Sequence, residues 1–126
     1  MIEFQRTYAL DPKVYGRSGL IFGYAVNGRW ADADRERALL NREDMGRSPN
    51  HRRMIVQLAY GEFNDAMSSL ERGVADQEGL LGLMSIPCDP IFDPLKSNPR
   101  FDALMKRLNI RACPATGTWP IAPRRA

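Results

Sequence analysis

A six-residue pattern occurs twice in this chain and limits the available folds more than any other feature. Gly28-Arg29-Trp30-Ala31-Asp32-Ala33 is matched 33 positions later by Gly61-Glu62-Phe63-Asn64-Asp65-Ala66. Each copy places an aromatic residue two positions after a turn glycine and an alanine three positions further on. Helix pairs that repeat about every 34 residues carry small residues where the helices cross. The pattern therefore predicts a turn between two helices at Gly28 and another at Gly61.

The rest of the chain also has the spacing of helices rather than strands. Apolar residues recur three and four positions apart between prolines and glycines, and no β-branched runs compete. We expect Asn98-Pro99 to open the last helix, since a polar cap followed by proline is a favourable helix start. Helices are predicted over 2–10, 13–27, 31–44, 79–86 and 98–110. Two more are predicted between them, one from Pro49 to near Tyr60 and one that is capped by Asn64 and ends at about Asp76.

Glycine is unusually frequent within the predicted helix 13–27. Gly16, Gly19 and Gly23 each cost helix stability, because glycine has no side chain to limit its unfolded conformations. We expect them to let a neighbouring helix approach closely.

At the other end of the chain, the segment 111–126 holds three prolines and is interpreted as a flexible tail with Trp119 as its only large anchor.

Composition is that of one ordinary globular domain. The chain has 126 residues and a net charge of +3, with acids interspersed among the bases. This balance favours solubility rather than a nucleic-acid footprint. The densest basic group lies near the middle of the chain, and nucleic-acid binding through Arg47, Arg52 and Arg53 stays an alternative. No apolar run is long enough to cross a membrane and the N-terminus does not resemble a signal peptide, so a cytoplasmic protein is expected.

Catalytic and metal-binding residue patterns are weak. The two cysteines, Cys88 and Cys113, form neither a CxxC motif nor a metal knuckle, and reduced thiols are expected. His51 is the only histidine and has no nearby cysteine in the sequence. Asp89, Asp93 and Asp102 are interpreted as turn formers and a first-turn helix charge. We therefore expect a protein that is not an enzyme and uses no metal or cofactor.

The helix-pair pattern resembles the tetratricopeptide repeat. Phe4 to Pro12 looks like the closing half of such a repeat, which ends its second helix in Leu-Asp-Pro. The most specific similarity is the stretch from Cys88 to Phe101, which reads Cys-Asp-Pro-Ile-Phe-Asp-Pro-Leu-Lys-Ser-Asn-Pro-Arg-Phe. It is similar to the ending of many bacterial proteins of this family. Against the pattern, Arg37 stands where a large apolar residue is usual. A helical bundle without repeats is the alternative fold.

The resemblance implies an all-α fold of antiparallel helix pairs stacked as a short right-handed superhelix. It divides the chain into a half repeat (1–12), two repeats (13–46 and 47–78), a C-terminal capping segment (79–110) and the tail (111–126). Such a solenoid presents a concave groove to a protein or peptide partner. The positions implied to face that groove are Tyr15, Ser18, Phe22, Ala25, Val26, Ser48, His51, Ile55, Leu58 and Ala59.

Two further expectations come from the resemblance. The groove residues lack the lysine and asparagine with which some members bind a chaperone's terminal carboxylate, so an apolar helix or extended peptide is the expected ligand. The first helix has no partner helix within the sequence, and Ile2, Phe4 and Tyr8 would then be uncovered. We expect homodimerisation through this end, with contact to an upstream part of a longer protein as the alternative. A separate alternative is that the domain is a regulatory tail of a larger signalling protein.

Overall fold

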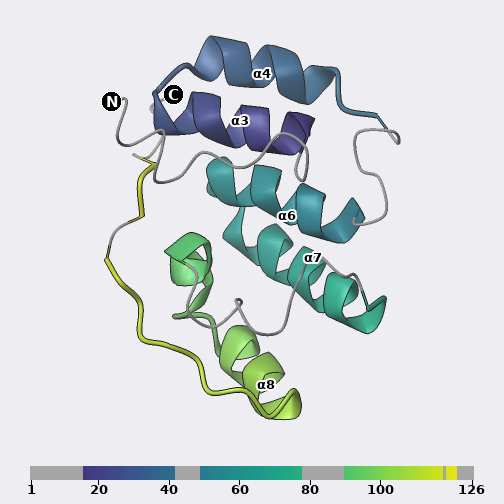
Figure 1. Ribbon diagram of the computed structural model, residues 1–126, viewed down its shortest axis with the longest axis vertical. Coiled ribbons are helices and arrows are strands. Elements are labelled where there is room, and N and C mark those ends of the chain that lie inside the picture. Colours follow the sequence, from purple (N-terminus) through teal and green to yellow (C-terminus); the bar gives the residue numbers. More distant parts are fainter. Residues whose placement is uncertain (1–15, 42–48, 78–89, 118, 122–126) are drawn as a thin grey trace.

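A computed structural model describes residues 16–41, 49–77, 90–117 and 119–121. Within these ranges the chain forms helices and no strand, which confirms the all-α fold for this part of the protein (Figure 1). The helices are α3 (Arg17–Val26), α4 (Trp30–Ala38), α6 (Pro49–Ala59), α7 (Phe63–Ala75), the 3-10 helix η2 (Pro90–Leu95) and α8 (Pro99–Arg107).

The helices are stacked in the order α4, α3, α6, α7. Helix α3 packs against both α4 and α6, and α6 packs against α7 (Figure 1). Beyond α7, both η2 and α8 contact that helix. Neighbours along the chain are therefore neighbours in space, apart from the last residues, which run from the end of α8 back to α3 (Figure 1).

The two predicted turns share one backbone geometry. The φ angle is 70° at Gly28 and 74° at Gly61. In the first turn, Arg29 N donates to Tyr24 O at 2.9 Å and Gly28 N donates to Ala25 O at 3.0 Å. The second turn repeats both bonds 33 residues later, from Glu62 N to Gln57 O at 2.9 Å and from Gly61 N to Leu58 O at 3.1 Å. This is the Schellman ending, which requires a left-handed residue and so favours glycine.

Helix crossings lie where the alanine pattern predicted them. Ala33 and Ala66 are both 0% exposed. Around them, the apolar side chains of α3, α6 and α7 join those of η2 and α8 in one main cluster, with a smaller cluster between α3, α4 and α6. Small side chains at these two positions let the helices of each pair draw together, so that their flanking residues can pack.

Several helix boundaries differ from the sequence prediction. Gly16 has a φ of 58° and precedes α3, which begins at Arg17 rather than at residue 13. Helix α4 ends at Ala38, with Leu39 as its C-cap, instead of extending to residue 44. Asn64 was expected to cap α7, yet α7 begins at Phe63 with Glu62 at the N-cap. The reason is that the Schellman turn fixes where the next helix starts, and no side-chain cap is formed there.

Close approach of a neighbouring helix at Gly23 was predicted and is wrong. A Cβ built at Gly23 has no atom within 4 Å outside its own helix and adjacent residues. At Gly16 the nearest atom to such a Cβ is Arg52 Nη1, at 3.8 Å, which is ordinary contact. Only Gly19, which is buried, is in a packed position among these three. Glycine at position 23 therefore weakens α3 without allowing any closer packing.

Helix α8 agrees closely with the prediction. It begins at Pro99, and the Asn98 side chain accepts a hydrogen bond from Arg100 N at 2.9 Å. Phe101, Leu104 and Met105 are buried on one side of this helix.

Three groups of predictions lie outside the described residues: the helices over 2–10 and 79–86, the self-association residues Ile2, Phe4 and Tyr8, and the positions Tyr15, Arg47 and Ser48.

The expectation of reduced thiols is wrong. Cys113 forms a disulfide bond, and Cys88 is the only other cysteine in the chain. The sequence spacing gave no reason to pair them, because pairing depends on how the chain folds back after α8 rather than on any local motif.

Among the described helices, none is long and apolar enough to cross a membrane.

Candidate functional site

The described residues that were predicted to line an open groove are buried, apart from half-buried Val26. Phe22 and Leu58 are each 1% exposed and Ile55 is 0% exposed, so these side chains belong to the core. Val26 is half-buried and packs against the same cluster. Ser18 and His51 are buried polar residues at the start of α3 and α6. The structure therefore brings the apolar positions together, as predicted, but does not leave them open to solvent.

The C-terminal residues contribute to this closure. We call residues 111–117 and 119–121 the strap. The ring of Trp119 meets Phe22 edge to face, with centroids 5.8 Å apart and an interplanar angle of 78°. Ile121 is 8% exposed and belongs to the same cluster as Phe22, Ile55 and Leu58. The tail was expected to be flexible with Trp119 as its only large anchor; Ile121 is a second anchor, while Pro114 to Gly117 are exposed.

Asp93 holds the middle of the strap. Its carboxylate accepts hydrogen bonds from Thr116 N at 2.9 Å and from Thr116 Oγ1, and it pairs with Lys96 Nζ at 3.2 Å. The Asp93 and Lys96 side chains are only 5% and 7% exposed. Burial alone raises the pKa of Asp93, but the hydrogen bonds from Thr116 and Lys96 outweigh it and lower the pKa below its ordinary value. Asp93 is therefore a buried, ionised anchor rather than a simple turn former.

A second polar cluster joins the two helix pairs. Arg37 on α4 donates to both carboxylate oxygens of Glu62, at 2.9 and 2.8 Å, and lies over the Tyr60 ring at 4.3 Å from its centroid. Tyr60 Oη donates to Asp34 at 2.8 Å, and Trp30 packs edge to face on Tyr60. The hydrogen bond with Glu62 raises the pKa of Arg37. This explains why arginine stands where the repeat pattern favours an apolar residue.

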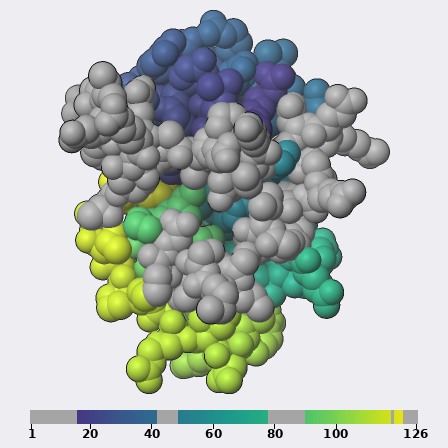
Figure 2. All heavy atoms as spheres, in the orientation of Figure 1, coloured from purple at the N-terminus to yellow at the C-terminus, as the bar shows by residue number. Residues whose placement is uncertain are grey.

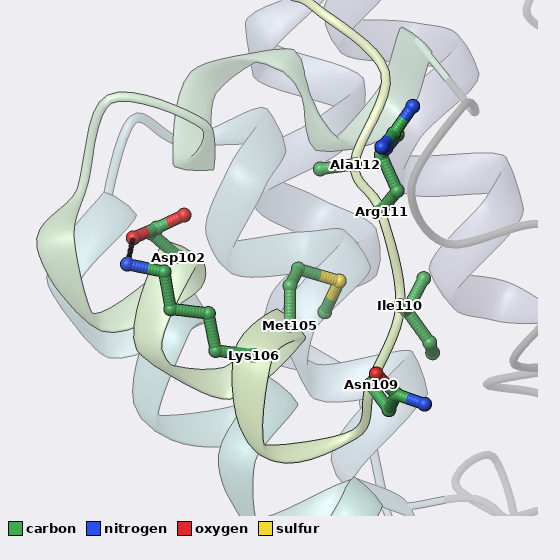
Figure 3. A pocket seen from close by; sticks show the side chains of 7 residues that line it. All are labelled: Asp102, Met105, Lys106, Asn109, Ile110, Arg111 and Ala112. Atoms are coloured by element: carbon green, nitrogen blue, oxygen red, sulfur yellow. Dashed lines mark ion pairs between the residues drawn. The ribbon is translucent and has the colours of Figure 1, made fainter.

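One hollow lies between α8 and the strap. It has a volume of about 520 Å³ and is lined by the residues labelled in Figure 3. Within its lining, Asp102 and Lys106 form an ion pair at 3.0 Å, and both side chains are mostly exposed. A neighbouring hollow of about 400 Å³ lies on the other side of Asp102 and includes Asp93 and Cys113. Both hollows lie beside the strap.

The described part of the chain bears on the expected metal-binding and nucleic-acid groups. There, no cluster of three or more His, Cys, Asp or Glu side chains could hold a metal ion. Of the arginines proposed to contact nucleic acid, Arg52 and Arg53 are half-buried on α6, and Arg53 donates to Asn50 Oδ1 at 3.0 Å. At least one of these guanidinium groups is thus engaged by the protein's own side chain.

Neither the packing of the strap's end nor its polar anchor at Asp93 was predicted from the sequence. One available signal was the spacing of Trp119 and Ile121, since residues two apart share a side of an extended chain. The pairing of Asp93 with Thr116 had no such signal, because 23 residues and a complete helix separate them. In the space-filling view, α8 lies at the bottom of the molecule, and the yellow strap runs up its left side to the green spheres of η2 (Figure 2).

Comparisons with known proteins identify no relative. The chain matches no family model, no curated protein and no solved structure.

Proposed function

We propose that this chain is a non-catalytic protein–protein interaction module of the tetratricopeptide type. The observation that carries the proposal is the pair of turns at Gly28 and Gly61, which repeat the same two backbone hydrogen bonds 33 residues apart. Each turn leads into a helix whose fourth residue is a fully buried alanine, Ala33 in α4 and Ala66 in α7. The turn and the buried alanine that follows it thus recur together after 33 residues, as in helix-pair repeats.

The stacking order also supports the proposal. Helices α3 and α6 are the first helices of their pairs and pack directly against each other. In solenoids of helix pairs, adjacent first helices line the concave side, where partners bind. The face carried by half-buried Val26 and by the buried side chains of Phe22, Ile55 and Leu58 is therefore the proposed partner surface once it is opened, and we call it the inner face. It is apolar, which favours an apolar helix or an extended segment over a charged ligand.

Position-specific crosslinking tests this function. A diazirine-bearing aliphatic amino acid would replace Val26, which is half-buried at the inner face, or Arg35, which is exposed on α4. Illumination in an extract of the source organism is expected to link one defined protein to position 26 and not to position 35. Equal labelling at both positions, or a partner captured only through position 35, would contradict the assignment. Helical circular dichroism of both variants checks that each is folded.

Two finer points belong to the same proposal. Self-association through Ile2, Phe4 and Tyr8 stays a prediction, and a monomeric mass in light scattering at micromolar concentration would contradict it. A cytoplasmic location also stays a prediction. The disulfide at Cys113 counts against it, because reducing compartments keep most thiols unpaired.

A further inference from the structure

The strap lies on the surface that the proposed function assigns to partners. Trp119 packs on Phe22 of α3, and Ile121 enters the apolar cluster that contains Phe22, Ile55 and Leu58. Both residues belong to an irregular segment without helix, and they are two positions apart. In an extended chain, side chains two apart point to the same side. The two anchors therefore face the body of the protein together.

The chemistry of the strap matches that of the inner face. From Ala112 to Ile121 the sequence contains no charged residue, and it has prolines at 114 and 120. Phe22, Ala25, Ile55 and Leu58 present only carbon atoms from their side chains and are at most 3% exposed. An occupant of this face is thus an extended, uncharged segment with an aromatic and an aliphatic side chain two positions apart. The strap is one example of such a segment.

Attachment of the strap differs along its length. Its first part is held by the disulfide at Cys113, by Lys96 Nζ donating to Pro114 O at 3.4 Å, and by the hydrogen bonds from Thr116 to Asp93. Residues 119–121 make no hydrogen bond or ion pair with the rest of the described chain, and side-chain packing holds them. The end of the strap can therefore leave the inner face while the beginning stays attached.

Building on the interaction module proposed above, we propose that residues 119–121 are a displaceable occupant of the inner face. A partner's extended, uncharged segment with the same aromatic-and-aliphatic spacing takes their place. The strap then acts as a tethered competitor. A tethered segment has an effective concentration of about 1 mM, so a free peptide with a Kd of about 100 μM for the open face is weakened about tenfold.

A peptide titration on the full chain tests the displacement. The probe is a fluorescein-labelled synthetic peptide with the sequence of residues 114–121, and its binding is measured by fluorescence anisotropy. We expect the double variant Trp119→Ala with Ile121→Ala to bind this peptide about tenfold more tightly than the unmodified chain. Equal binding to both proteins overturns the proposal, as does absence of binding to a double variant that keeps its helical circular dichroism.

Matched controls isolate the inner face. The double variant Leu39→Ala with Phe63→Ala also loses two large apolar side chains, but these are exposed on the other helices, at 55% and 37%. It is expected to bind the peptide as weakly as the unmodified chain does. A peptide with alanine in place of its tryptophan and isoleucine is expected to bind none of the proteins. Adding Phe22→Leu to the strap double variant is expected to weaken its peptide binding about fivefold.

Oligomeric state separates a partner from a second copy. If the unmodified chain has a dimeric mass in light scattering that becomes monomeric in the strap double variant, copies exchange their straps, and the assignment to a separate partner is overturned. Failure of the peptide titration leaves the crosslinking result at position 26 intact, so it rejects strap displacement alone. If crosslinking fails and the titration succeeds, the proposed external partner is rejected. The binding of residues 119–121 to the inner face is then retained.

Discussion

The helix pairs α3–α4 and α6–α7 are joined by the same turn but differ in how deeply their second helices are buried. Helix α4 has one buried residue, Ala33, and its outward side carries Asp32 paired with Arg29 at 2.7 Å and with Arg35. The other second helix, α7, buries Ala66, Met67, Ser69, Leu70 and Gly73. A common turn thus sets the geometry of both pairs, while burial depends on the layers that lie against each second helix.

The difference has a physical cause in the neighbours of each helix. Helix α7 packs against α6 on one side and receives η2 and α8 on the other, so it needs an apolar surface in two directions. Helix α4 packs mainly against α3. In stacked repeats, an outermost helix keeps a polar outer side, because nothing covers it. Within the described residues, α4 has the composition of an end and α7 that of an interior layer.

The largest effect expected from this contrast is at Leu70. Replacing this fully buried residue with alanine leaves a cavity in α7, and we expect a loss of about 3 kcal/mol in the free energy of unfolding. Leu39→Ala, at the exposed end of α4, is expected to change it by less than about 0.5 kcal/mol. Urea denaturation followed by circular dichroism measures both. Equal losses would show that α4 is buried as deeply as α7.

Asp93 provides the next test, because it holds part of the layer that covers α7. Asp93→Asn removes the charge from hydrogen bonds with Thr116 and Lys96, and we expect a loss of about 2 kcal/mol at neutral pH. The lowered pKa means that the folded protein binds this proton less readily than the unfolded chain does. The Asp93 contribution is therefore complete above about pH 4, the unfolded value, and is lost as the pH falls through the lower folded pKa.

Urea denaturation at a series of pH values between neutral and acid conditions checks this linkage. Asp93→Asn is expected to have a flatter acid dependence than the unmodified chain, since the titrating group is gone. The isosteric change Thr116→Val in the strap, which removes only the hydroxyl donor, is expected to give an intermediate profile. Parallel curves for the unmodified chain and Asp93→Asn would contradict the role assigned to this carboxylate.

The turns are expected to behave alike despite the unequal helices. Both Gly28 and Gly61 have positive φ angles, and a Cβ at either position has open space around it. Alanine at each site is therefore expected to cost about 1 kcal/mol through backbone strain alone. Thermal or urea unfolding of the two single variants gives the comparison. A much larger loss at one site would show that the turns are not equivalent.

The smallest expected change is a gain in stability. Gly23→Ala places a methyl group in open space within α3, where it limits the unfolded chain and favours the helix. We expect an increase of about 0.5 kcal/mol in the free energy of unfolding, measured by urea denaturation. A decrease would show that the backbone of α3 does need glycine at position 23, as the sequence first suggested.

Local features of the fold could be predicted from the sequence. The turns at Gly28 and Gly61, the buried alanines at 33 and 66, and the start of α8 at Asn98-Pro99 all depend on residues within a few positions of one another. Helix ends were less accurate at residues 39–44, because apolar Leu39 and Leu40 look like helix interior although the helix ends at Ala38.

Nonlocal features could not be predicted in the same way. The apolar positions Phe22, Ile55 and Leu58 were correctly grouped, but their burial involves side chains distant in the sequence, among them Trp119, which packs on Phe22. The Asp93–Thr116 contact and the disulfide at Cys113 depend equally on the chain returning past η2. Helical periodicity contains no information about that return, so neither the burial of the groove positions nor the disulfide bond could be predicted.

The contact between Trp119 and Phe22 changes how the whole stack should unfold. In an open series of repeats, each layer touches only the next, and terminal layers can fray while the others persist. Here the last described segment is packed on α3, the second helix of the stack, so loss of either α3 or this segment removes support from the other. The strap, α3 and the helices between them are therefore expected to unfold together, rather than one layer at a time.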